Sequence, residues 1–148
     1  MEPENSRAGT VKTFTLKEAN AMLPYVSKIF EKVTSLNDQI KSITFDIENL
    51  VSIWGKDVLE NGHIDNEYYF SMVSQRENTF QNLIKIVGDM QSMGCVIKDI
   101  DKGLIDFYYD NEGELVFLCW KYGEDKIMHW HPVDGGFTNR SSINQLKQ

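Results

Sequence analysis

The side chains best suited to chemistry in this 148-residue sequence lie in its last third. Asp106 offers a carboxylate, Cys119 a thiol, and His129 and His131 two imidazoles. All four lie in segments whose branched and aromatic residues predict β-strands. Because side chains alternate between the two faces of a strand, His129 and His131 share one face, and alternation can bring Asp106 and Cys119 to it.

One interpretation of this face is a metal site. Asp106 would supply oxygen, and His129 and His131 would supply nitrogen. Glu124 and Asp134, in the adjoining turns, could add a further carboxylate. Ligands of these types suit zinc, iron or manganese, so a divalent metal ion is the cofactor that this pattern would imply.

A structural interpretation competes with the metal site and is favoured by the residue pattern alone. Asp106 and His131 would form one hydrogen-bonded pair that orients the strands, and Cys119 would be a small core residue. A His-x-His pattern on a strand is common, and it is much less specific than a complete ligand set.

Two catalytic interpretations stay open. Cys119 could act as a nucleophile with His131 as its base, oriented by Asp106 or Asp134. A thiol in the middle of a strand is, however, usually buried and inert. Asp106 and Glu124 could share acid–base work if burial separates their pKa values, which a sequence does not show.

Two glycine-containing loops also resemble ligand sites, but less closely than the group of Asp106, Cys119, His129 and His131 does. Residues 99–103 contain two aspartates but lack the spacing and the distal glutamate of a calcium loop, so a polar turn is expected. Gly135 and Gly136, with Arg140 close behind, could hold an anion through backbone amides and a guanidinium group. A simple turn is the favoured interpretation of the two glycines.

The elements that must position these side chains form a small sheet. Strand patterns cover residues 95–99, 103–109, 114–121 and 126–131. Hairpin turns between them predict an antiparallel β-meander of three to four strands. One face of this sheet is apolar or aromatic, with Trp120 and Trp130 on it, and we expect that face to be buried.

A helical hairpin is predicted ahead of the sheet. Thr15 and Glu18 form a capping-box pattern for a short first helix, and Pro24 is expected to turn or kink it into a longer one. From residue 26 to residue 54, apolar side chains recur every three or four positions. This heptad pattern is typical of a coiled coil and requires a partner helix.

Residues 66–94 repeat the heptad spacing after a loop near residues 55–65, so they supply the partner helix. The two apolar seams fit one antiparallel register, which pairs Val33 with Val87, Ile40 with Phe80, and Ile47 with Val73. Arg76 interrupts the second seam. We interpret it as a register-setting polar residue and expect a carboxylate beside it, from Asp46 or Glu48.

These patterns together predict an α+β protein. The expected organisation is a disordered tail at 1–13, a coiled-coil-like helical hairpin at 14–94, a β module packed on it at 95–140, and a frayed tail at 141–148. The sequence has no secretory signal pattern and no apolar run long enough to span a membrane, which favours a cytoplasmic location with both cysteines reduced. The net charge of −7 disfavours binding to nucleic acid or to anionic membranes.

Several stretches also carry a family resemblance. They are residues 14–24, Lys98-Asp99, residues 103–107, residues 118–120, Gly123-Glu124, Trp130-His131, Gly136-Phe137 and Arg140. Together they resemble the uncharacterised bacterial family catalogued as domain of unknown function 2203, over nearly the whole chain. The chain departs from the family pattern at Tyr108, where proline is usual, and at Pro132, where an acidic residue is usual. The second departure weakens a ligand role at that position.

The family has no established activity, so the resemblance implies a fold and a location for the site but no reaction. Two function classes follow. The first is a non-enzymatic binding or regulatory module, whose hairpin would contact a protein partner or form a homo-oligomer. The alternative is a small metal-dependent enzyme of hydrolase type that uses Asp106, Glu124 and His131.

Overall fold

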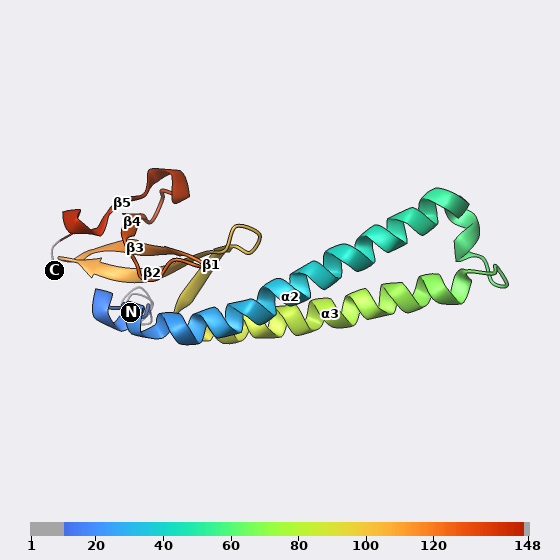
Figure 1. Ribbon diagram of the computed structural model, residues 1–148, viewed down its shortest axis with the longest axis horizontal. Coiled ribbons are helices and arrows are strands. Elements are labelled where there is room, and N and C mark those ends of the chain that lie inside the picture. The colour runs from blue at the N-terminus through green and yellow to red at the C-terminus, as the bar shows by residue number, and fades with distance from the viewer. Residues whose placement is uncertain (1–10, 147–148) are drawn as a thin grey trace, which may run out of the picture. The chain divides into compact units, whose positions relative to one another are not determined.

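The computed structural model describes residues 11–146, which form two compact units. One unit contains residues 11–31 and 87–146, and the other contains residues 32–86. Helices α2 (Leu16–Trp54) and α3 (Asn66–Ser92) each contribute to both units (Figure 1). No helix within the described residues is both long and apolar enough to cross a membrane. The tail residues 1–10 and 147–148 lie outside the described residues.

The start of α2 has the predicted capping box. Thr15 N donates to Glu18 Oε1 at 2.9 Å, and Glu18 N donates to Thr15 Oγ1 at 3.0 Å. The helix then continues through Pro24, so the separate short helix expected from the sequence was wrong. Leu23 and Val26, on either side of the proline, are 4% and 0% exposed, and their shared burial keeps the helix intact despite the lost hydrogen bond.

In the unit of residues 32–86, the two helices pack together near the loop that joins them. The buried residues of this core are Ile47, Leu50, Val58 and Met72. The loop begins with a 3₁₀-helix, η1 (Gly55–Leu59), and Trp54 Nε1 donates to Asp65 Oδ2 across it at 2.8 Å. These contacts agree with the predicted hairpin and its loop near residues 55–65.

The seam of α3 differs from the predicted one. Phe80 is 44% exposed, whereas Thr79 is 8% exposed and its hydroxyl donates to Gln75 O at 2.8 Å. Because that hydroxyl is satisfied by its own helix, a threonine can occupy the buried position. Arg76 donates to Thr44 Oγ1 at 3.4 Å instead of to the predicted carboxylate.

The C-terminal part of the chain forms an antiparallel sheet of five strands in chain order. The strands are β1 (Cys95–Asp99), β2 (Leu104–Asn111), β3 (Glu114–Lys121), β4 (His129–Pro132) and β5 (Ser141–Ser142). The predicted α+β class and antiparallel meander are confirmed, although the sheet has five strands where three to four were expected. The frayed end predicted at 141–148 was wrong for its described part, because β5 pairs with β4 and Leu146 is only 6% exposed.

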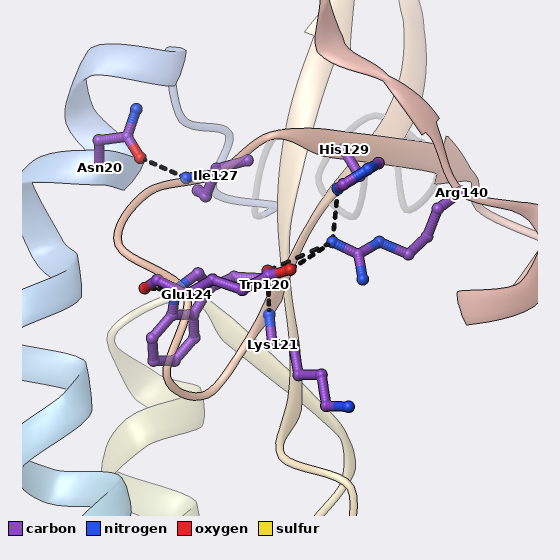
Figure 2. A network of polar contacts seen from close by, with 7 residues as sticks. All are labelled: Asn20, Trp120, Lys121, Glu124, Ile127, His129 and Arg140. Atoms are coloured by element: carbon purple, nitrogen blue, oxygen red, sulfur yellow. Dashed lines mark hydrogen bonds and ion pairs between the residues drawn. The ribbon is translucent and has the colours of Figure 1, made fainter.

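One face of the sheet packs on the first part of α2. Phe107 and Trp120 are 0% and 1% exposed, and the Phe107 ring packs edge-on against Phe14 with 5.3 Å between centroids. Ile127 N donates to Asn20 Oδ1 at 2.8 Å, which attaches the loop before β4 to the helix (Figure 2). The apolar face is therefore buried, as the sequence predicted.

The opposite face is buried as well, although the sequence did not indicate a cover for it. The segment that follows β4, with the short helices η2 (Phe137–Asn139) and η3 (Ile143–Gln145), lies on the side of the sheet away from α2 (Figure 1). Its residues Gly135 and Gly136 line a cavity together with Asp106 on the sheet. The polar residues of this face thus lie between two layers.

Candidate functional site

Three neighbouring strands bring Asp106, Cys119 and His131 together, and we call these residues the Asp106 cluster. Asp106 on β2 lies opposite Cys119 on β3, and His131 on β4 lies opposite Phe117, the preceding residue of β3 on the same face. One ligand-type atom from each residue of the cluster lies within 4.8 Å of the others. Asp106, Cys119 and His131 are 0%, 1% and 2% exposed.

The imidazole of His131 is held at both nitrogens. Nδ1 lies 2.7 Å from the carbonyl oxygen of Pro132, and Nε2 lies 2.9 Å from Asp106 Oδ2. A carbonyl oxygen can only accept, so Nδ1 carries a proton and donates to Pro132. The lone pair of Nε2 is then directed at Asp106, and a proton or another cation must lie between these two acceptors.

Asp106 has one oxygen engaged and one unpaired. Oδ1 is buried and has no hydrogen-bond partner among residues 11–146. Burial raises the pKa of the Asp106 carboxyl, while His131, the charge of Lys98 and a hydrogen bond with the Cys119 thiol act in the opposite direction. Leaving a buried carboxylate oxygen unpaired is costly, and Oδ1 is free to coordinate a ligand.

Cys119 is a protonated thiol unless a cation binds it. Burial raises the pKa of Cys119 to about 12, and the negative charge of Asp106 acts in the same direction. A thiol with so high a pKa is a poor nucleophile, which argues against the nucleophilic interpretation of this residue. The same thiol would lose its proton on coordinating a metal ion.

A cavity of about 80 Å³ adjoins the Asp106 cluster. Its lining residues are Lys98, Leu104, Asp106, Cys119, His131, Gly135, Gly136 and Phe137. The Lys98 ammonium group lies 4.5 Å from the centroid of the Phe117 ring on this face of the sheet. A positive charge, a carboxylate, a thiol and an imidazole therefore border one small space.

A second group of polar residues, Glu124, His129 and Arg140, forms what we call the Arg140 cluster (Figure 2). Arg140 Nη2 donates to Glu124 Oε2 at 2.9 Å, to Glu124 Oε1 at 3.2 Å and to His129 Nδ1 at 2.6 Å. Lys121 N donates to Glu124 Oε1 at 2.8 Å. This network attaches the segment after β4 to strands β3 and β4 and leaves both Glu124 oxygens engaged.

The structure thus separates the residues that the sequence grouped into one site. Asp106, Cys119 and His131 converge, whereas Glu124, His129 and Arg140 form the other cluster. Asp134 is exposed in the turn after β4 and does not line the cavity.

Lys98 is the cavity residue that sequence reasoning missed. Val96 of β1 pairs with Asp106, so alternation within β1 places Lys98 on the Asp106 face, but the sequence does not reveal this register between β1 and β2. Phe137 and Leu104 were missed too, because apolar side chains give no sign of lining a polar site.

Comparison with known proteins gives a family but no activity. Residues 12–143 match the model of a family described as an uncharacterized conserved protein, DUF2203, in agreement with the resemblance noted above. No curated protein matches the chain, and no solved structure matches it.

Proposed function

Because the chain belongs to the DUF2203 family, whose description names no activity, we propose a function from its site: it binds one divalent transition-metal ion through Asp106, Cys119 and His131. The observation that carries this proposal is the convergence of three different ligand-type atoms within 4.8 Å in a buried place. The chain would then be a metal-binding module, with a structural or regulatory role for the ion.

The hydrogen bonds of His131 support this proposal. Metal-bound histidines usually donate their other ring N–H to a carbonyl or carboxylate, which fixes the tautomer and the ring orientation. The contact of Nδ1 with Pro132 O at 2.7 Å has this form and leaves Nε2 as the ligand atom. A metal ion would take the place of the proton that Nε2 and Asp106 Oδ2 otherwise share.

The donor set favours zinc, iron(II) or cobalt(II) over magnesium, calcium or manganese. Thiolate and imidazole ligands prefer the later transition metals, whereas hard cations prefer all-oxygen sites. One carboxylate and one thiolate also balance the two charges of the ion. The site would therefore be close to neutral when occupied, which lowers the cost of its burial.

A hydrolase that uses Glu124 as a third ligand has less support. Both oxygens of Glu124 accept hydrogen bonds from Arg140, so recruiting this carboxylate to the metal would break that ion pair. Cys119 is the residue that stands beside Asp106 and His131 instead.

Elemental analysis of the untagged protein, combined with two matched cysteine variants, tests the metal proposal. We expect about one equivalent of zinc or iron in the wild type, and its loss in Cys119→Ser. Cys95→Ser is the control, since Cys95 is 2% exposed but lies opposite Phe107 on the apolar face. Metal-free wild type that also fails to bind added zinc would leave Asp106 and His131 as a structural pair only.

We also propose that the helical unit of residues 32–86 contacts a second copy of the chain. Phe70, Phe80 and Ile84 are 48%, 44% and 48% exposed, and their spacing puts them on one side of α3. Exposed apolar side chains grouped in this way mark contact surfaces, and symmetric dimers are the commonest oligomers. Light scattering should give a dimer that Phe80→Ser weakens, and a strict monomer would contradict this second proposal.

A further inference from the structure

We propose that the cavity beside the Asp106 cluster binds a small monoanion, of the size of formate or bicarbonate, between the metal ion and the ammonium group of Lys98. This inference rests on the proposed metal site and names the class of ligand that the site would take. It is carried by the lining of the cavity, its charge balance and its volume.

The occupied metal site would have an open coordination position. Zinc and related ions are usually four-coordinate, and sites with three protein ligands bind water or a small ligand in the fourth position. Asp106, Cys119 and His131 all line the cavity, so the fourth position would face it. Within residues 11–146, Asp106 Oδ1 is buried and unpaired, and as an acceptor it can coordinate the metal ion or accept a hydrogen bond from the hydroxyl group of bicarbonate.

The charges favour an anion in this position. A divalent ion is balanced by the Asp106 carboxylate and the Cys119 thiolate, with His131 neutral. Lys98, which lines the same cavity, adds one positive charge. Lys98 is exposed to solvent, so its charge favours a monoanion in the cavity but does not require one for neutrality.

The cavity limits the size of the anion. Its volume of about 80 Å³ is enough for roughly two to three water molecules, so formate or bicarbonate would fit and an aromatic carboxylate would not. Leu104 and Phe137 add apolar walls.

Cobalt substitution gives a direct test with the full-length, untagged chain. The visible absorption of bound Co²⁺ reports its ligands, so formate entering the fourth position should change the spectrum saturably. Benzoate at the same concentrations should leave it unchanged. Lys98→Met should bind Co²⁺ as the wild type does but weaken the binding of formate by about threefold to fivefold, since it removes a nearby but exposed charge. Lys102→Met, at a second exposed lysine that lies in the β1–β2 turn and does not line the cavity, should behave as the wild type does.

The outcomes separate this inference from the proposal on which it rests. A wild type that does not bind Co²⁺ overturns the metal site itself. Bound Co²⁺ whose spectrum formate does not change overturns the anion inference and leaves the metal site standing. Formate binding that is equally strong in Lys98→Met, or benzoate binding as strong as that of formate, also overturns it.

Discussion

The Asp106 cluster and the Arg140 cluster lie on the same face of one sheet, yet their hydrogen-bonding groups are used very differently. In the Arg140 cluster, both oxygens of Glu124 accept hydrogen bonds from Arg140. In the Asp106 cluster, Oδ1 of the carboxylate is unpaired within residues 11–146, and a cavity of about 80 Å³ adjoins it. Burial also differs, because the Glu124 side chain is 30% exposed and that of Asp106 is 1% exposed.

This difference distinguishes a group that stabilises a fold from one that is suited to bind a ligand. In the Arg140 cluster every carboxylate oxygen is engaged, and the atom left without a partner among residues 11–146 is a donor, Arg140 Nε, which does not bind a cation. A buried carboxylate with an unpaired oxygen lies beside a thiol and an imidazole nitrogen, so one cation could bind three ligand atoms by displacing the proton between His131 and Asp106. Four predictions test the distinction.

The largest effect is expected from His131→Ala measured in the presence of a chelator. Removing the imidazole leaves the Asp106 carboxylate buried without its partner at 2.9 Å, which typically lowers the free energy of unfolding by about 3–5 kcal/mol. Urea unfolding followed by circular dichroism measures this loss. A loss below about 1 kcal/mol is the range of a surface ion pair. Such a result would mean that the Asp106 cluster is no more important for stability than the Arg140 cluster.

Metal binding should raise stability through the Asp106 cluster alone. With free zinc at a hundred times its dissociation constant, the free energy of unfolding should rise by about 2.7 kcal/mol, and a chelator should reverse the rise. Asp106→Asn should abolish this gain. The matched variant Glu124→Gln should keep it, and a gain that both variants retain would contradict the assignment of ligands.

Thiol labelling should be slow at both cysteines of the folded protein. Burial raises the pKa of Cys95 to about 11 and that of Cys119 to about 12. At pH 8 the thiolate fraction of each cysteine is therefore at least about a hundredfold smaller than that of an ordinary thiol. Mass spectrometry after alkylation measures both rates. Zinc should slow the labelling of Cys119 further and leave that of Cys95 unchanged; equal protection of the two thiols would count against coordination by Cys119.

The smallest effect is expected from Arg140→Ala. The guanidinium lies in a partly exposed pair, so its loss should lower the free energy of unfolding by only about 1 kcal/mol. Zinc affinity should stay within about twofold of the wild type, because Arg140 holds the covering segment but supplies no ligand. Calorimetric zinc titration checks this expectation. Loss of zinc binding in this variant would show that the Arg140 cluster is part of the zinc site.

Local sequence rules predicted the parts of the fold that local chemistry decides. The side chains of Thr15 and Glu18 cap the same backbone amides that a capping box requires. Strand alternation placed Trp120 on the buried face and put Asp106 and Cys119 together on the other. Both depend on spacing within short segments.

The parts that failed depend on packing between distant segments. Pro24 predicted a break, but burial of the residues around it keeps α2 continuous. Phe80 was chosen for the seam because it is apolar, and the buried residue is Thr79. Hydrophobic patterning has no means of detecting a hydroxyl that its own helix satisfies.

The candidate site was predicted too broadly for the same reason. Glu124 and His129 have suitable chemistry and lie on or beside the same strands, but Arg140 engages both of them. That arrangement depends on residues after β4 folding back over the sheet, and the sequence shows no strong periodicity there. The register that pairs Val96 with Asp106, and so places Lys98 on the same face as Asp106, is likewise set only in the folded sheet.

X-ray absorption at the metal edge tests the central claim most directly. Protein purified without a tag and loaded with one equivalent of zinc should show one sulfur neighbour at about 2.3 Å and nitrogen or oxygen neighbours at about 2.0–2.1 Å. The sulfur signal should disappear in Cys119→Ser and persist in Cys95→Ser. A shell of nitrogen and oxygen alone in the wild type, or protein that retains no zinc, would contradict the assignment of Asp106, Cys119 and His131 as a metal site.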